Sequence, residues 1–324
     1  MQKTISVVNL TAIRRNAQKI KSTVGRAKVF AVVKANAYGH GAEQVALCLQ
    51  NEVYGFCVAI VEEGVKLRIC GVQNTILVLC PPLCKYDCAR AKFYNLTVTV
   101  NSVATAKLIN GLPCHLKINT GMNRIGCNLS ELEKILSVLN KNQIKGVYSH
   151  LYCAEDENAC NEQLKIFNEA EKAVKFINKN ALAHIAASGG ILRGEKFFKD
   201  CVRCGILLYG YPPNGFKIKG FTPALKVFAR RVQATNFIGS GVGYAKANKN
   251  YTMLSTYRLG YADGFFRTVP LGENNLCMDA FISQTNKSLL PVLNDAEKYA
   301  TTANTISYEI LCKATQRSEI IYEK

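Results

Sequence analysis

The stretch Val29-Phe-Ala-Val-Val-Lys34-Ala-Asn-Ala-Tyr38-Gly-His-Gly41 carries the most information in this chain of 324 residues. Its apolar first half predicts a strand that delivers Lys34 to its C-terminal end, and a glycine-flanked turn follows. The nearest acid downstream is Glu43. Partial desolvation without a nearby anion lowers the pKa of a lysine and makes its amine a usable nucleophile. A single lysine at a strand end is more often simply solvated, so the rest of the chain has to decide between the two readings.

Apolar runs recur along the first two thirds of the chain, mostly separated by stretches with helical patterning. Eight such runs over about 200 residues predict a (β/α)8 barrel of the TIM type, although an open doubly wound sheet remains an alternative on strand number alone. The predicted strands are Val29–Ala35, Gly55–Ile60, Thr75–Leu79, Leu96–Val100, His115–Asn119, Lys145–His150, Leu182–Ser188 and Cys201–Gly210.

Two helices of the barrel region have clear signals. Ser130 and Glu133 have the spacing of a capping box ahead of an apolar face formed by Leu132, Ile135, Leu136 and Leu139. Glu162–Lys179 places its apolar residues at near-helical spacing. Both predict helices packed against the sheet.

The pattern changes after Tyr211-Pro-Pro-Asn-Gly. From Phe221 onward, strand-like segments are separated by Gly, Asn and Pro turns, which predicts a second, smaller and mostly β domain. We therefore expect a barrel domain over residues 1–220 and a C-terminal β domain over residues 221–324. The predicted strands of the second domain are Leu225–Ala234, Tyr251–Leu259 and Leu276–Ser283.

Composition excludes several classes of protein. The chain is 48% hydrophobic and has a formal net charge of +18. It contains no apolar run of about 18 residues, so no membrane span is expected. Its lysines are dispersed and no nucleic-acid motif is evident, which favours a solvated basic surface. The basic N-terminus reads as a strand (Ile5–Leu10) and a helix (Thr11–Lys21) rather than a targeting segment, which predicts a cytoplasmic protein.

The cysteines predict reduced structural thiols rather than a metal site. Most of the 14 cysteines lie in apolar runs, where free cysteine behaves as a small hydrophobe. Cys201-Val-Arg-Cys204 has no second pair and no histidine at ligand spacing, so no metal is expected.

Chemistry-bearing residues fall where a barrel would gather them. Catalytic groups of this fold lie at the C-terminal ends of the strands, and its phosphate sites follow strands seven and eight. The sequence places such residues at or just beyond the ends of four predicted strands, namely Lys34, Lys117 with Arg124, His150 and Ser188, and places Arg203, Gly205 and Ile206 on the eighth strand.

Blocks along nearly the whole chain resemble the bacterial alanine racemases. Lys34-Ala-Asn-Ala-Tyr38-Gly-His-Gly resembles the lysine motif of that family, which binds pyridoxal 5′-phosphate (PLP). The other blocks follow in the family's order. They are Lys117-Ile-Asn-Thr-Gly-Met-Asn-Arg124-Ile-Gly, Tyr148-Ser-His150, His184-Ile-Ala-Ala-Ser188, Arg203-Cys-Gly205-Ile206-Leu-Leu-Tyr209-Gly, Val242-Gly-Tyr244, Leu259-Gly-Tyr261-Ala-Asp263-Gly, Cys277-Met278-Asp279 and Ile306-Ser-Tyr308-Glu309.

The resemblance implies a homodimeric, PLP-dependent racemase that interconverts L- and D-alanine and supplies D-alanine for peptidoglycan. Lys34 would hold PLP and act as one base, and Tyr244 of the second subunit would act as the other. His150 and Arg203 would bind the cofactor, with Arg203 facing its pyridine nitrogen, and would provide the cationic surroundings that the tyrosine needs. The phosphate would be held by Tyr38, Ser188, Gly205, Ile206 and Tyr308. The substrate carboxylate would be held by Arg124 and the backbone N–H of Met278, Tyr261 would narrow the entrance, and Lys117 is a candidate for carbamylation.

The chain departs from the family pattern at several points. Asn119 replaces an aspartate, Ala187 replaces an asparagine, and the stretch between Tyr261 and Met278 is short. A smaller second domain would weaken the dimer. Two alternatives follow: a serine or broad-specificity racemase of the same fold, and a PLP-binding, degenerate paralogue without turnover. The second domain and Tyr244 argue against a single-domain PLP carrier. The blocks Gly-Tyr261-Ala-Asp263-Gly and Cys277-Met278-Asp279 argue against a PLP-dependent decarboxylase on the same barrel.

Overall fold

The computed structural model describes residues 4–324, which form two compact units, each discontinuous in sequence. One comprises Ile13–Ala37 and Ala42–Phe221. The other comprises Tyr38–Gly41, Thr222–Lys324 and the described residues up to Ala12. The division into domains 1–220 and 221–324 stays a prediction.

Eight parallel strands build the first unit, as the sequence predicts. They form two four-stranded sheets, ordered β4-β3-β2-β9 and β5-β6-β7-β8. Backbone hydrogen bonds join the sheets at both edges, from Val78 N–H to Thr97 O (2.8 Å) and from Arg203 N–H to Ala186 O (2.9 Å), and so close the barrel. The strands are β2 (Lys28–Val32), β3 (Gly55–Val58), β4 (Thr75–Val78), β5 (Val98–Val100), β6 (Cys114–Lys117), β7 (Ile144–Tyr148), β8 (Leu182–His184) and β9 (Cys201–Cys204).

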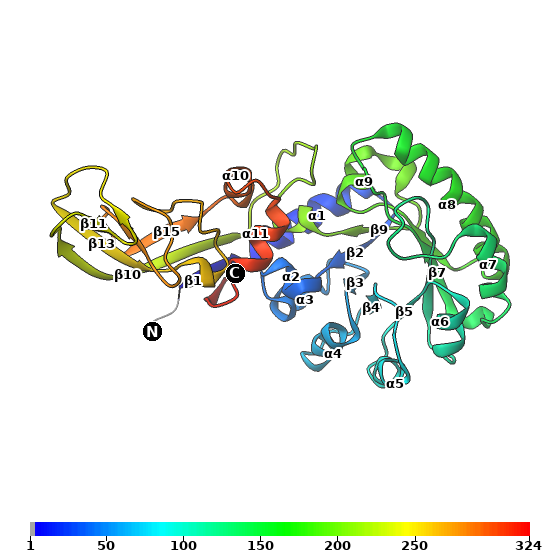
Figure 1. Ribbon diagram of the computed structural model, residues 1–324. Coiled ribbons are helices and arrows are strands. Elements are labelled where there is room, and N and C mark those ends of the chain that lie inside the picture. The colour runs from blue at the N-terminus through cyan, green and yellow to red at the C-terminus, as the bar shows by residue number, and fades with distance from the viewer. Residues whose placement is uncertain (1–3) are drawn as a thin grey trace. The chain divides into compact units, whose positions relative to one another are not determined.

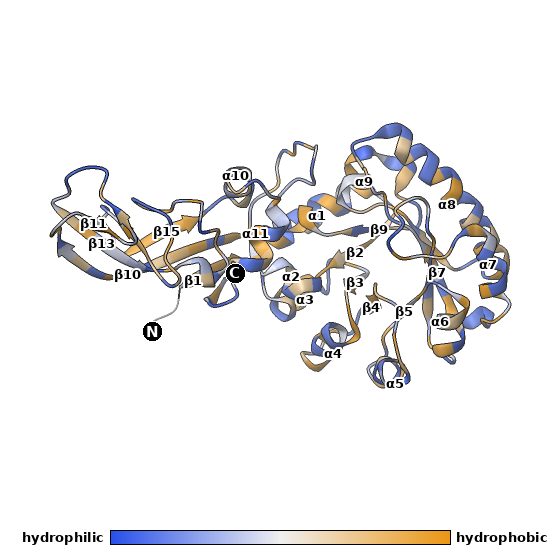
Figure 2. Ribbon diagram, in the orientation of Figure 1, coloured by the Kyte–Doolittle hydropathy of each residue, from blue (hydrophilic) through white to orange (hydrophobic). Residues whose placement is uncertain are grey.

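Every residue of β3, β5, β6 and β9 is buried. Strands that are covered on both faces have continuous apolar sequences, which is why these strands could be predicted from the sequence. Helices α4 to α8 follow one another around the outside (Figure 1), and Figure 2 shows the hydrophobic strands beside helices with mixed surfaces. The helices are α1 (Leu10–Val24), α3 (Ala42–Leu49), α4 (Val61–Ile69), α5 (Lys85–Phe93), α6 (Val103–Leu108), α7 (Leu129–Leu136), α8 (Glu157–Ile177) and α9 (Ser188–Arg193).

Most element ends differ from the sequence prediction by a few residues, and four of the differences bear on the site or on the helix caps. Helix α7 begins at Leu129, because Glu131 accepts the N–H of Asn128 at 3.0 Å; the predicted Ser130–Glu133 capping box is wrong by two residues. Helix α8 begins at Glu157, where Asp156 accepts the N–H of Ala159 at 3.1 Å. The predicted seventh strand ends at His184 and the eighth at Cys204. The 3₁₀ turns η1 (Lys141–Gln143), η2 (Glu195–Phe197) and η3 (Ile206–Tyr209) complete this unit.

The second unit is a mostly β structure built around strand β10 (Leu225–Asn236). Its main sheet has the order β14-β13-β10-β1-β16, with β15 also paired to β10. The N-terminal strand β1 (Ile5–Asn9) runs antiparallel to β10 and parallel to β16 (Glu319–Glu323). The remaining elements are β11 (Gly241–Val242), β12 (Ala245–Lys246), β13 (Met253–Arg258), η4 (Tyr261–Asp263), β14 (Phe281–Ser283), β15 (Leu289–Leu293), α10 (Ala296–Thr302) and α11 (Ser307–Lys313).

No helix within residues 4–324 is long and apolar enough to cross a membrane. The 14 cysteines all lie within the described residues, and none of them is in a disulfide. The described residues also contain no group of three or more His, Cys, Asp or Glu side chains placed to hold a metal ion.

Candidate active site

Lys34 lies two residues beyond β2 and begins the short turn α2 (Lys34–Tyr38), so it is not the last residue of the strand as predicted. Ala35, Asn36 and Ala37 have φ values of 52°, 53° and 54°. This is one turn of left-handed backbone without a glycine, and each such residue costs about 1–2 kcal/mol. Lys34 itself is half-buried. The barrel therefore presents this amine on a strained support.

Arg203 lies on β9 with only 3% of its surface exposed. Its Nη1 donates to His184 Nδ1 at 2.6 Å and to His184 O at 3.0 Å. Its Nη2 donates to the carbonyl oxygens of Ser149 (2.5 Å) and Ile185 (3.2 Å) and lies 3.5 Å from His150 Nδ1. The guanidinium is thus held by backbone carbonyls and two imidazoles.

The arginine dictates the tautomers of the histidines around it. A guanidinium only donates, so His184 Nδ1 must accept and its proton sits on Nε2. His184 Nε2 in turn donates to His115 Nδ1 at 2.7 Å. Burial, reinforced by Arg203, lowers the pKa of His184 well below its ordinary value and that of His115 to about 3. The positive charge of this chain of side chains therefore stays on Arg203.

The roles of His115 and His184 were not predicted from the sequence. Each lies on a strand in an apolar run, so the burial of both side chains could be predicted from the sequence. The contact between them could not be predicted, because β7 separates β6 from β8 in the sheet. The ring of Tyr148 on β7 fills the interval, stacked on His184 with centroids 5.0 Å apart.

His150 lies two residues beyond β7, and four predicted cationic residues act on it. Burial first, then the charges of Arg203, Lys117, Arg124 and Lys34, lower its pKa well below the ordinary value. These surroundings favour a neutral imidazole with the positive charge on Arg203, and the predicted role of His150 beside the tyrosine stays a prediction. The same electrostatics show that one end of the barrel gathers these predicted residues.

Lys117 is the last residue of β6 and is buried (8% exposed). Burial and the charges of Arg203 and Arg124 lower the pKa of Lys117 well below its ordinary value. Its Nζ lies 4.5 Å from the centroid of the Tyr148 ring. These surroundings favour an uncharged amine, which is the form that reacts with carbon dioxide.

Arg124 is exposed on the loop that leads from β6 to α7. Asn119 organises this loop: its Oδ1 accepts the N–H groups of Gly121 (3.2 Å) and Asn123 (3.0 Å). Its Nδ2 donates to the Oδ1 atoms of Asn123 (2.9 Å) and Asn128 (3.2 Å). A carboxylate only accepts, so an aspartate at 119 lacks the last two bonds. Asn119, which departs from the family pattern, thus has neighbours that accept the two hydrogen bonds of its amide group.

Ser188 is buried at the start of α9 rather than at the end of a strand. Its hydroxyl accepts the N–H groups of Gly205 (3.3 Å) and Leu207 (3.4 Å). Gly205 and Ile206 lie beyond β9, at the start of η3, and not on the strand as predicted. Backbone donors and a hydroxyl thus converge at the predicted phosphate position. Ala187 precedes the helix without a side-chain cap.

In the second compact unit, the rings of Tyr38 and Tyr308 lie side by side, with centroids 5.9 Å apart. Tyr308 lies in the first turn of α11. The Thr315 hydroxyl donates to the carbonyl of Gly39 at 2.9 Å, which fixes the segment that carries Tyr38. The two tyrosines predicted to hold the phosphate are therefore neighbours.

Tyr261 and Met278 are also brought together in this unit. Tyr261 N–H donates to Cys277 O at 3.1 Å, and Ala262 N–H donates to Met278 O at 3.0 Å. Tyr244 lies in the hairpin turn between β11 and β12, with 90% of its surface exposed. Within its own unit the Tyr244 side chain is therefore almost fully exposed.

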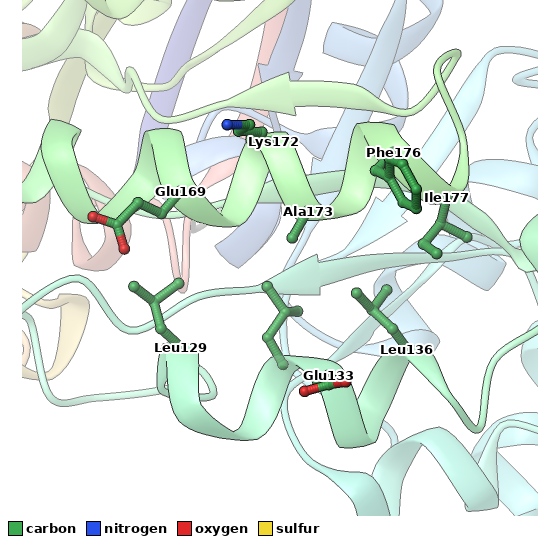
Figure 3. Close-up of a pocket in the computed structure, with 9 residues that line it drawn as sticks. Leu129, Glu133, Leu136, Glu169, Lys172, Ala173, Phe176 and Ile177 are labelled. Carbon is green, nitrogen blue, oxygen red and sulfur yellow. The ribbon is translucent and has the colours of Figure 1, made fainter.

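An open pocket lies between α7 and α8 on the outside of the barrel (Figure 3). Its walls are mainly leucine and other apolar side chains, with Glu133, Glu169 and Lys172 at the rim. None of the predicted site residues lines it, so it is separate from the cluster at the barrel end.

Comparisons with known proteins agree with these blocks. Residues 8–213 match the family model described as alanine racemase, N-terminal domain. The alanine racemase of Streptococcus uberis is 31% identical, covering 97% of this chain and 96% of the relative, and that of Carboxydothermus hydrogenoformans is 38% identical, covering 80% and 76%.

Solved structures give the same result. An alanine racemase from Clostridium difficile has a TM-score of 0.88 at 26% identity, with 100% of this chain and 96% of that chain covered. An alanine racemase from Bartonella henselae, described as having covalently bound pyridoxal phosphate, has a TM-score of 0.83 at 28% identity, with 99% of both chains covered.

Proposed function

This chain belongs to the alanine racemase family and is an amino-acid isomerase, and on that premise we propose that it interconverts L- and D-alanine with two bases, Lys34 and Tyr244 of a second copy. The observation that carries the proposal is the half-buried Lys34 amine, held on a left-handed turn at the barrel end that also gathers Arg203, Lys117 and His150.

The residues present fit pyridoxal 5′-phosphate. Lys34 offers a primary amine for the covalent link, and Arg203 offers a buried cation. The N–H groups of Gly205 and Leu207 donate to the Ser188 hydroxyl at 3.3 and 3.4 Å; a bound phosphate oxygen would take over these two donors, and the hydroxyl would donate to it as well. Ile206 extends this backbone segment, and the neighbouring Tyr38 and Tyr308 offer two further hydroxyls.

Bound PLP supplies an electron sink for the electrons that remain when the α-proton is removed. Lys34 Nζ takes or returns the proton on one face of the α-carbon, and Tyr244 Oη does so on the other. Two bases are needed, since one base alone tends to return the proton to its own side. The exposed Tyr244 turn supports a role in the site of a second copy.

Tyrosine has an ordinary pKa of about 10 and is a poor base at neutral pH without help. His150 directs its Nδ1 toward the Arg203 guanidinium, so its remaining proton lies on Nε2. That N–H can donate to the Tyr244 oxygen, while Arg203 supplies the positive charge behind it. This arrangement supports an anionic Tyr244.

The same site suggests a small substrate. We assign the substrate carboxylate to Arg124 and the N–H of Met278, and the entrance to Tyr261. Tyr308, which lies beside Tyr38, is assigned to the cofactor phosphate, and a tyrosine ring in that role would leave little room for a larger or hydroxylated substrate side chain. Alanine is therefore favoured over serine.

Family membership supports three further proposals: that the protein acts as a homodimer, that it works in the cytoplasm, and that its D-alanine enters peptidoglycan. The lowered pKa of Lys117 supports carbamylation of its amine, which would place a negative charge between Arg203 and Arg124.

The first test is interconversion of L- and D-alanine by the purified protein with added PLP, with L-serine in parallel. Turnover of alanine well above serine is the expected result. Turnover of serine at an equal rate would favour a broad-specificity racemase. A Lys34-linked chromophore without any turnover would favour a degenerate paralogue.

A further inference from the structure

The left-handed turn after Lys34 has to be held in place by its neighbours. Ala35, Asn36 and Ala37 have ψ values of 50°, 44° and 48°, and Tyr38 continues the turn with a φ of 53°. L-residues disfavour this conformation, and it persists only where surrounding contacts determine it. The contacts of this turn therefore fix the position of the adjoining Lys34 amine.

Three hydrogen bonds anchor the turn. Ala37 N–H donates to Val33 O at 2.8 Å, and Asn36 Oδ1 accepts the N–H of Ala42 at 2.9 Å. Ala35 N–H donates to Glu63 Oε1 at 2.7 Å. The bond from Ala42 ties the turn to the helix that follows it, α3, and the bond to Glu63 ties it to the first turn of α4, which lies beyond the next strand of the barrel.

The second oxygen of Glu63 holds the neighbouring strand. Glu63 Oε2 accepts the N–H of Ala59 at 2.6 Å, and Ala59 directly follows β3. Strands β2 and β3 are parallel neighbours, and Val33 N–H donates to Cys57 O at 2.9 Å where they end. One carboxylate thus joins the ends of both strands through two charge-assisted bonds.

We propose that Glu63 is a positioning residue that fixes the Lys34 amine by holding the N–H groups of Ala35 and Ala59 with one carboxylate. The proposal rests on the proposed function, in which Lys34 carries the cofactor and moves the proton. Glu63 acts through the backbone of the turn, not on substrate. A glutamine at 63 has a single acceptor oxygen and cannot replace both bonds.

Glu62 provides a matched control. It is the adjacent residue on α4, carries the same charge and is exposed. Glu62→Gln therefore changes the local charge as Glu63→Gln does, and leaves the bonds to Ala35 and Ala59 intact.

The first measurement is amide hydrogen exchange in the cofactor-free protein. Glu63→Ala should lower the protection of the Ala35 and Ala59 amides by about tenfold or more, as expected for loss of a hydrogen bond to a charged group. Glu63→Gln should do so at one of the two. The Val78 amide, which bonds to Thr97 O in the barrel wall, should stay protected and so report an intact fold. Parental protection of both amides in Glu63→Ala would overturn the proposal.

The second measurement is the reaction of Lys34 with added PLP, followed by its absorbance, together with kcat and KM for alanine. Glu63→Gln should form the Lys34 adduct about tenfold more weakly and lower kcat more than it changes KM, while Glu62→Gln should match the parent. Lost amide protection with a parental adduct and a parental kcat would overturn the proposal. If the parent itself turns over no alanine, the proposed function fails, and exchange and adduct formation still decide the role of Glu63.

A second variant guards against a general loss of structure. Glycine tolerates a positive φ, and the Ala35 side chain is exposed, so Ala35→Gly should relax the demand on Glu63. The Ala35→Gly/Glu63→Gln protein should recover part of the Lys34 adduct lost in Glu63→Gln. Equal loss in both proteins would show that Glu63 acts elsewhere and would overturn the proposal.

Discussion

Replacing Asp263 measures how far the turn η4 depends on one buried carboxylate. Asp263 is 2% exposed, and its Oδ2 accepts from Arg258 Nη1 at 2.9 Å and from Gly260 N–H at 2.8 Å. Arg317 Nε lies 3.6 Å from the other oxygen. We expect Asp263→Ala to lower the free energy of unfolding by about 3 kcal/mol. This is the lower end of the range for breaking a buried ion pair, because both arginines keep contact with water.

Asp263→Asn separates the hydrogen bonds from the charge. An amide oxygen in the position of Oδ2 still accepts from Arg258 and Gly260, so the expected loss is about 1 kcal/mol. The alanine variant should also raise the KM for alanine, because η4 holds Tyr261 and Met278, which we assign to substrate. The asparagine variant should leave KM close to the parental value.

The chain contains no tryptophan, so unfolding in urea is best followed by circular dichroism, with midpoints compared at a shared slope. Asp279→Ala is the control. Asp279 pairs with Arg317 at 2.9 Å, but half of its side chain is exposed, and its removal should cost less than about 1 kcal/mol. A loss below about 0.5 kcal/mol for Asp263→Ala, or equal losses for the alanine and asparagine variants, would refute the reasoning.

Four further outcomes are expected. Burial lowers the pKa of His115 to about 3 in the folded protein, against about 6.5 when unfolded, so the free energy of unfolding should fall as the pH drops from 6.5 toward 3. In urea titrations, His115→Gln should make this fall shallower by about 1 kcal/mol per pH unit. An unchanged slope would contradict the lowered pKa of His115. Asn119→Asp should raise the KM for alanine several-fold, since it loses the donation to Asn123, while Asn123→Ala should act in the same direction; a parental KM in both would count against the loop argument. ¹³C-labelled bicarbonate should give a carbamate NMR signal that Lys117→Arg abolishes, and a signal that persists would exclude this lysine as its source. Specific activity should fall on dilution if Tyr244 serves a second copy, and activity independent of protein concentration would oppose that role.

The eight barrel strands could be predicted because each is a continuous apolar run between helical stretches, whereas strand number alone did not separate a barrel from an open sheet. The ends of the elements were harder to predict, since more than one residue had the spacing expected of a helix cap. Ser130 and Asn128 both precede a glutamate by three positions, and the structure uses Asn128. Local pattern identifies a helix start only to within a turn.

The site divides in the same way. Site residues that belong to sequence motifs, such as Lys34 and Arg203, could be predicted. The hydrogen-bond partners that position them could not. Within Ala-Asn-Ala only the asparagine belongs to a residue type that often adopts the left-handed conformation, and the contact of Ala35 with Glu63 is not visible in the local sequence. The chain from Arg203 through His184 to His115 crosses strands far apart in sequence, and no local spacing encodes it.

The pairing of β1 with β10 and β16 constrains how the chain can be made. Glu319 leaves the ribosome long after its parallel partner Ile5, because the whole barrel lies between them in the chain. While the barrel strands emerge and pair in turn, β1 therefore lacks the strands on both of its sides. Unpaired strands of nascent chains are sites of aggregation. Production of this protein should thus respond to chaperones that shield its N-terminal segment until β16 emerges.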